Sequence, residues 1–134
     1  VFDYGCGHCQ DMERLRERGI QATGYDPYYR PKVGKVRAHI VNLGFVLNVI
    51  EVPEERAEVL HDAWKLTKLM MVVTVIRPQD AHRGTPFGDG IVTSKGTFQH
   101  YFGNEELAEL LVKNLEAGII EKAGDRMFIA FKLG

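Results

Sequence analysis

The chain has 134 residues, of which 45% are hydrophobic and 26% are charged, and its formal net charge at pH 7 is −1. This length and composition predict one globular domain over residues 1–134. The near-zero net charge excludes a positive potential over the whole surface, so a nucleic acid partner would need a local basic patch. The longest apolar run, residues 69–76, is too short to cross a membrane, and two cysteines three positions apart exclude a framework of disulfides. We therefore expect a soluble, cytoplasmic protein. Because the sequence starts without methionine inside a strand pattern, an excised or trimmed core is expected.

The first elements are a strand, a tight turn and a helix. Residues 1–4 are β-prone, Gly5 and Gly7 interrupt the strand, and residues 10–18 have apolar side chains at helical spacing. Residues 20–25 predict a second strand. This order is that of a βαβ unit.

An acidic residue, Asp26, follows the second strand, 19 positions after Gly7. In nucleotide-binding βαβ units a carboxylate at about this interval accepts hydrogen bonds from ribose hydroxyls. The glycines let the backbone turn tightly and approach a ligand. The segment therefore favours a nucleotide-binding turn.

The same turn contains Cys6-Gly7-His8-Cys9, which has the spacing of a dithiol redox site. A thiol oxidoreductase that uses Cys6 and Cys9 stays open as an alternative, although an acid at the nucleotide position is not part of a thioredoxin pattern. A zinc site is weaker still, because no second ligand pair stands at the usual spacing. No metal is expected.

Residues 27–36 contain two prolines and a glycine and predict a loop. The later pattern predicts, in chain order, a buried strand at 37–43, an apolar run at 44–50, a helix from Pro53 to near Lys68, an all-apolar strand at 69–76, a turn-rich segment at 77–103, a helix that Asn104 caps and Gly118 ends, and a hairpin of 119–121 and 127–132. The fold class is therefore α/β: a mostly parallel, doubly wound sheet with a C-terminal antiparallel hairpin and one reduced βα unit.

The run Asp3-Tyr4-Gly5-Cys6-Gly7 resembles motif I of class I S-adenosylmethionine (SAM)-dependent methyltransferases, which have a Rossmann-like fold. The resemblance implies that the turn lies beside the methionine part of SAM and that Asp26 binds the ribose. Because the loop at 27–36 stands where the family has a further strand and helix, we expect Tyr28, Tyr29 or Arg30 to cover the adenine instead; a surface loop with incidental aromatic residues is the alternative. The cofactor-binding residues are then expected to be Asp3, Tyr4, Gly5, Cys6, Gly7, Asp26, Pro27, Tyr28, Asn42 and Leu43.

Longer stretches are similar to a narrower group, the DNA phosphorothioation-associated methyltransferases. They are FDYGCG, GYDPYYRP, VNLGFVLNVIEVPEERAE, GDGIVTSKGTFQHYF and ELAELL. This similarity implies methyl transfer, with DNA as the leading acceptor. A domain that binds SAM or its demethylated product, S-adenosylhomocysteine (SAH), without catalysis is the main alternative.

The run Asn42-Leu43-Gly44-Phe45 resembles the motif of methyltransferases that act on exocyclic amines, with Leu43 and Gly44 in place of its prolines. By this resemblance the amide oxygen of Asn42 accepts a hydrogen bond from the amine, and Phe45 stacks on a flipped base. The alternative is that Asn42 binds SAM or fixes the turn while Phe45 packs in the core.

Residues 86–102 are the expected substrate element, because long polar segments inside compact domains are often functional. Asp89 or His100 is the candidate general base. A modest phosphate patch would consist of Arg77, Arg83, Lys95 and His100, and a solvated loop is the alternative.

Overall fold

The computed structural model describes residues 1–116 and 118–133. The elements, in chain order, are β1 (Phe2–Tyr4), α1 (Gln10–Glu17), β2 (Thr23–Tyr25), β3 (Ala38–Gly44), the 3₁₀ turn η1 (Leu47–Val49), α2 (Pro53–Leu66), β4 (Thr67–Thr74), the 3₁₀ turn η2 (Pro78–Asp80), β5 (Gly84–Phe87), β6 (Gly90–Thr93), β7 (Phe98–Gln99), α3 (Asn104–Asn114), β8 (Gly118–Gly124) and β9 (Met127–Lys132). None of these helices is long and apolar enough to cross a membrane.

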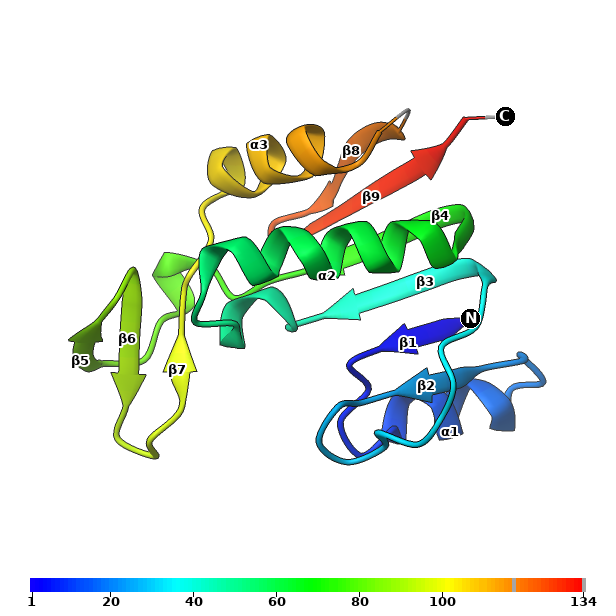
Figure 1. Ribbon diagram of the computed structural model, residues 1–134, viewed down its shortest axis with the longest axis horizontal. Coiled ribbons are helices and arrows are strands. Elements are labelled where there is room, and N and C mark those ends of the chain that lie inside the picture. The colour runs from blue at the N-terminus through cyan, green and yellow to red at the C-terminus, as the bar shows by residue number, and fades with distance from the viewer. Residues whose placement is uncertain (117, 134) are drawn as a thin grey trace.

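The main sheet has six strands in the order β2-β1-β3-β4-β9-β8. The first four strands are parallel, and β9 is antiparallel to both of its neighbours, β4 and β8. In Figure 1, β1, β2 and β3 point to one end of the molecule, where the small sheet β5-β6-β7 lies. The predicted α/β class, with a parallel sheet and a terminal hairpin, is confirmed.

The reduced βα unit lies between β2 and β3. Residues 27–37 contain no strand or helix, and their regular pairing is one isolated bridge between Asp26 and Arg30. Lys35 of this loop binds Asp62 of α2 at 2.7 Å, and its ammonium lies over the rings of Tyr4 and Tyr25. Burial and the hydrogen bond to Asp62 raise the pKa of Tyr4 to about 12. A polar cluster thus closes the side of the sheet where the predicted unit is reduced.

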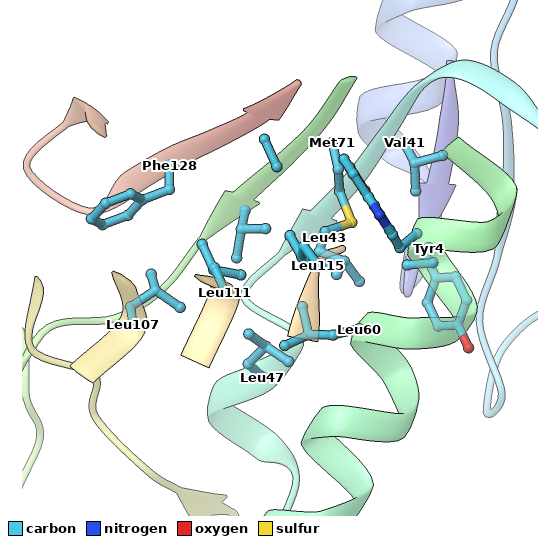
Figure 2. Packing of buried hydrophobic residues seen from close by; sticks show 14 of the residues in the cluster. Tyr4, Val41, Leu43, Leu47, Leu60, Met71, Leu107, Leu111, Leu115 and Phe128 are labelled. Carbon is cyan, nitrogen blue, oxygen red and sulfur yellow. The ribbon is translucent and has the colours of Figure 1, made fainter. Parts of the chain in front are cut away.

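One face of the main sheet carries the hydrophobic core. Alternate residues of its strands point to α2 and α3, as the period of two in a strand requires, and Figure 2 shows buried side chains from strands and helices gathered in this cluster. The fully buried members include Phe2, Val41, Leu43, Leu47, Leu60, Met71, Val73, Leu107, Leu111 and Ala130.

The opposite face is covered by α1 at its β1–β2 end. Cys9 and Met12 pack with Ala22 in a separate small cluster. Gly24 of β2 is essential to this contact, since a Cβ there would overlap the sulfur of Met12 and lie 2.9 Å from the side chain of Cys6. The glycine turn and α1 are thereby pressed against β2.

Several predicted boundaries shift for local reasons. The strand predicted at 20–25 begins only at Thr23, because Gly19, at φ +79°, and Ile20 complete the C-terminal turn of α1, with the N–H of Ile20 donating to the carbonyl of Leu15. The cap predicted at Asn104 was wrong: Gly103 is the N-cap and Asn104 is the first helical residue.

Helices α2 and α3 end earlier than the sequence pattern predicts. The helix predicted to reach Lys68 ends at Leu66, where Thr67 turns extended and begins β4. The last helix ends at Asn114 rather than beside Gly118.

The turn-rich segment at 77–103 contains the small antiparallel sheet, and a buried amide fixes it to the main sheet. The side chain of Asn48 is fully buried; its Nδ2 donates to the carbonyls of Ile76 (3.1 Å) and His100 (2.7 Å), and its Oδ1 accepts from the N–H of Ile76 (2.9 Å). The N–H of His100 donates to the backbone carbonyl of Asn48 at 2.7 Å. One residue therefore joins the segments that follow β3, β4 and β7.

The substitution Asn48→Ala tests this junction. It leaves the N–H of Ile76 and the carbonyl of His100 without the side chain that binds them, which we expect to lower the free energy of unfolding by about 2–3 kcal/mol. Urea denaturation of the variant gives this value, with the exposed Gln79→Ala as a control that changes little. Equal stability of the Asn48 variant and the wild type would contradict the assignment.

Candidate functional site

A cavity of about 370 Å³ opens at the carboxyl ends of β1, β3 and β4. It is lined by Asp3, Gly5, Cys6, Asp11, Asn42, Gly44, Phe45, Thr74 and Met127. Ligands of open α/β sheets bind at this edge, and the volume is in the range of small-molecule sites. A larger hollow of about 500 Å³, between α1 and β2, lies away from this edge and contains none of the predicted residues.

The glycine turn after β1 is held in place by backbone bonds to β2. The N–H groups of Gly5 and Cys6 donate to the carbonyl of Tyr25 at 2.7 and 2.9 Å. Gly5 has φ +86°, and a Cβ at this position would lie 2.6 Å from Cγ2 of Val46. Position 5 therefore requires glycine for both its conformation and its space.

The carboxylate of Asp26 joins this turn to the chain after β2. Its Oδ2 accepts from the N–H of Gly7 at 2.8 Å, and its Oδ1 accepts from the N–H groups of Tyr28 (2.8 Å) and Tyr29 (3.0 Å). Burial alone would raise the pKa of Asp26, but the three N–H donors outweigh it and hold this pKa below its ordinary value. Since a carboxylate has about four acceptor positions, about one remains for a ligand.

Asp3 and Asn42 form the polar floor of the cavity. Nδ2 of Asn42 donates to Oδ1 of Asp3 at 3.1 Å, which directs the amide oxygen of Asn42 away from Asp3. Asp3 is 8% exposed; burial raises the pKa of its carboxyl, and the bond from Asn42 opposes the rise. None of the nine residues that line the cavity is basic.

Phe45 stands at the rim in an unusual backbone conformation. Its φ is +60°, its side chain is 47% exposed, and its N–H donates to the carbonyl of Thr74 at 2.8 Å. A bulky residue in the left-handed region costs about 1–2 kcal/mol. The interpretation that Phe45 packs in the core was wrong, because the strained backbone turns its ring outward.

The other predicted cofactor residues are placed in two groups. The side chains of Tyr4 and Leu43 are buried on the opposite face of the sheet, so they can reach the cavity only through their backbone. Pro27 and Tyr28 are exposed beside Asp26, and Tyr28 is 81% exposed. The ring centroid of Tyr29 lies 4.0 Å from that of His8, so the two rings form an aromatic pair close to Asp26, which accepts the N–H of Tyr29.

The two candidate bases do not line the cavity. Asp89 forms a two-point ion pair with Arg56, whose side chain is buried in α2. His100 faces two acceptors: its Nδ1 lies 2.7 Å from the carbonyl of Asp89 and its Nε2 lies 2.8 Å from the carboxylate of Glu106. These contacts engage the carboxylate of Asp89 and both ring nitrogens of His100 away from the cavity, so the structure brings neither residue to it as a base.

Two of the four residues of the predicted phosphate patch are engaged by carboxylates. Arg77 is paired with Asp80 at 2.9 Å, and His100 is engaged by Asp89 and Glu106. Arg83 and Lys95 are exposed and lie in the chain just beyond the paired residues Gly84 and Thr93, at one end of the β5–β6 hairpin. Within residues 1–116 and 118–133, no three His, Cys, Asp or Glu side chains are grouped as metal ligands.

Sequence reasoning missed four of the lining residues. Thr74 ends β4, so the rule that sites lie at strand carboxyl ends could have found it. Asp11, Gly44 and Met127 come to the cavity through the turn of α1, the extension of β3 and the return of β9. Met127 in particular carries no local signal, since its place depends on the hairpin inserting beside β4.

The fold is similar to known methyltransferase structures, although no family model matches the sequence and no curated protein is significantly similar to it. The similar structures include the 1,6-didemethyltoxoflavin N1-methyltransferase of Burkholderia thailandensis with bound SAH (TM-score 0.71, 18% identity, 100% of this chain and 71% of that chain). The magnesium protoporphyrin IX methyltransferase of Synechocystis PCC 6803, also with SAH, has a TM-score of 0.67 at 15% identity, over 99% and 74% of the two chains. A SAM-dependent methyltransferase of Methanosarcina mazei has a TM-score of 0.74 at 17% identity, over 98% and 91%. The chain thus has the Rossmann-like fold of class I SAM-dependent methyltransferases.

The pair Arg56–Asp89 predicts a specific dependence of stability on pH. The Arg56 hydrogen bond holds the pKa of Asp89 below its ordinary value, so the pair stabilises the fold above about pH 4 and this contribution is lost as pH falls through the lowered pKa. Losing one partner of a buried pair costs about 3–5 kcal/mol, and we expect about 1–2 kcal/mol for Asp89→Asn at pH 7 because the Asp89 side chain is 37% exposed.

Urea unfolding at pH 7 and pH 3 measures this effect. The difference between Asp89→Asn and the wild type should shrink at pH 3, while the exposed Asp125→Asn should differ little from the wild type at either pH. A difference that is the same at both pH values would show that the ion pair is not its source.

Proposed function

We propose that this protein is a SAM-dependent methyltransferase that binds its cofactor in the cavity beside the glycine turn and methylates an amino group on a planar heteroaromatic ring. The observation that carries the proposal is the composition of that cavity. At the cofactor edge of a methyltransferase-like sheet it combines two carboxylates, Asp3 and Asp11, with the amide of Asn42 and the exposed ring of Phe45.

The charge of the cavity supports SAM rather than a dinucleotide. SAM carries a positive sulfonium and a positive ammonium group, and a cavity lined by Asp3 and Asp11 without a basic residue complements positive charge. The pyrophosphate of a nicotinamide dinucleotide would be repelled there. The acceptor position that remains on Asp26 suits a ribose hydroxyl, and the aromatic groups of Tyr28 and Tyr29 stand beside it for an adenine ring.

The amide of Asn42 supports an amine as the methyl acceptor. Because its Nδ2 is bound to Asp3, its oxygen is available to accept an N–H of the acceptor and to direct the nitrogen lone pair. SAM supplies an electrophilic methyl group. The nitrogen bonds to the methyl carbon as the carbon–sulfur bond breaks, SAH leaves, and the proton of the nitrogen passes to water. No protein base is required for this step. This agrees with the structure, in which Asp89 binds Arg56 and His100 binds Glu106 away from the cavity.

The ring that bears the amine can belong to a DNA base or to a free heterocycle. The resemblance to the DNA phosphorothioation-associated group favours a DNA base, stacked on Phe45 after flipping. The engagement of Arg77 and His100 by carboxylates favours a free ring, as do the small molecules named for two proteins of similar fold. Both sources present the same chemistry to Asn42 and Phe45.

A methyl-transfer assay with labelled SAM separates the sources. Its arms are duplex DNA, single-stranded DNA, and a pool of free amino heterocycles that contains adenine, cytosine and their nucleosides. Turnover in a DNA arm, or only in the free pool, supports methyl transfer and names the source. Binding of SAH without turnover in any arm would leave a SAM- or SAH-binding module, and no binding of SAH would overturn the proposal.

The variant Phe45→Gly separates stacking from stability. Glycine adopts the left-handed region without strain, so the variant should unfold at no lower urea concentration than the wild type. Loss of the ring should raise the KM for the acceptor at least tenfold, given stacking energies of about 1–3 kcal/mol, while SAH affinity stays within about threefold. The exposed Val49→Ala is the matched control, with unchanged KM. An unchanged KM in Phe45→Gly would exclude Phe45 as the platform.

A further inference from the structure

We propose that Cys6 and Cys9 form a reversible thiol–disulfide site whose oxidation state sets the affinity for the cofactor. The proposal rests on the proposed function, because it concerns the same cavity. It assigns a role to the two cysteines of the glycine turn, which methyl transfer itself does not use.

The two cysteines are joined across the turn that borders the cavity. Their sulfur atoms form a disulfide, and their Cα atoms lie 4.7 Å apart, within the range that a disulfide spans. The N–H of Cys9 donates to the carbonyl of Cys6 at 2.8 Å, which closes the turn. Cys6 stands between the two glycines of the turn and lines the cavity, whereas Cys9 is the N-cap of α1.

The surroundings of the two sulfur atoms are unequal. Cys9 is 2% exposed and packs against Met12 and Ala22. Behind Cys6 lies Gly24, where a Cβ would come within 2.9 Å of the Cys6 sulfur, so the space on that side is filled. The cavity is the direction in which the Cys6 side chain has room to move.

Reduction requires such a movement. Bonded sulfur atoms lie about 2 Å apart, whereas two thiols need roughly 3.5 Å or more between non-bonded atoms. Because Cys9 is enclosed, the thiol of Cys6 is displaced towards the cavity. The backbone of Cys9, at φ +62°, also loses the cross-link that helps to hold it in the left-handed region. Both changes disturb the turn that contacts the cofactor, so the reduced protein should bind it less tightly.

The oxidant is a small-molecule disulfide such as oxidised glutathione. One cysteine thiolate attacks it and releases one glutathione thiol, and the other cysteine then displaces the second glutathione from the mixed disulfide. The protein loses two electrons and two protons, and one oxidised glutathione becomes two reduced molecules. A phosphine or dithiol reductant reverses the reaction.

Calorimetric titration with SAH of the oxidised and the reduced wild-type protein tests the proposal. Mass spectrometry confirms the loss or gain of two hydrogens, and circular dichroism confirms that both states are folded. We expect the reduced protein to bind SAH at least about fivefold more weakly. The Cys6→Ser, Cys9→Ser double variant, treated with the same reagents, should show one affinity under both conditions.

Each result decides the proposal. Weaker binding by the reduced protein, with no redox response in the double variant, supports it. Equal affinity in the two states, or tighter binding by the reduced protein, overturns it while leaving the proposed cofactor intact. Absence of SAH binding in both folded states overturns this proposal together with the proposed function.

Discussion

The candidate site depends on one hydrogen-bonded carboxylate. Asp26 accepts the N–H groups of Gly7, Tyr28 and Tyr29, and so holds the glycine turn after β1 against the chain that leaves β2. With the turn in this place, Asp3 and Cys6 face one cavity at the carboxyl edge of the sheet. The same residue therefore orders the turn and keeps about one acceptor position, which we propose binds a ribose hydroxyl. Replacing the Asp26 carboxylate would therefore change both the position of the turn and the negative charge beside it.

A second set of polar contacts holds the small sheet at the same end of the molecule. Asn48 binds the chain after β4 and after β7, and Arg56 of α2 binds the β5–β6 turn through Asp89. These contacts engage the groups that would otherwise be candidates for proton transfer. In the proposed reaction, methyl transfer depends on orientation and charge rather than on a protein base, which suits attack by a neutral amine on a positively charged methyl donor.

The sequence predicted the class of fold and part of the site, and the reasons for the limits are physical. Local signals were sufficient for the glycine turn, for Asp26 and for the terminal hairpin, because spacing and alternation are properties of adjacent residues. The outward ring of Phe45 was not predicted, since its backbone is left-handed and its N–H binds the carbonyl of Thr74, 29 positions away, neither of which local spacing signals. Asn48 and Arg56 gave no signal, because their partners belong to elements that meet only in the folded chain. Asp89 and His100 were predicted as candidate general bases, and their spacing in the sequence could not show that they bind Arg56 and Glu106.

The measurement that tests the central claim most directly is calorimetric titration of the wild-type protein and of Asp26→Ala with SAH and, separately, with NADH. The account predicts micromolar binding of SAH to the wild type, at least tenfold weaker binding to the variant, or roughly 1.4 kcal/mol, and no comparable binding of NADH. Binding of NADH in preference to SAH, or absence of SAH binding to the folded wild type, would contradict it.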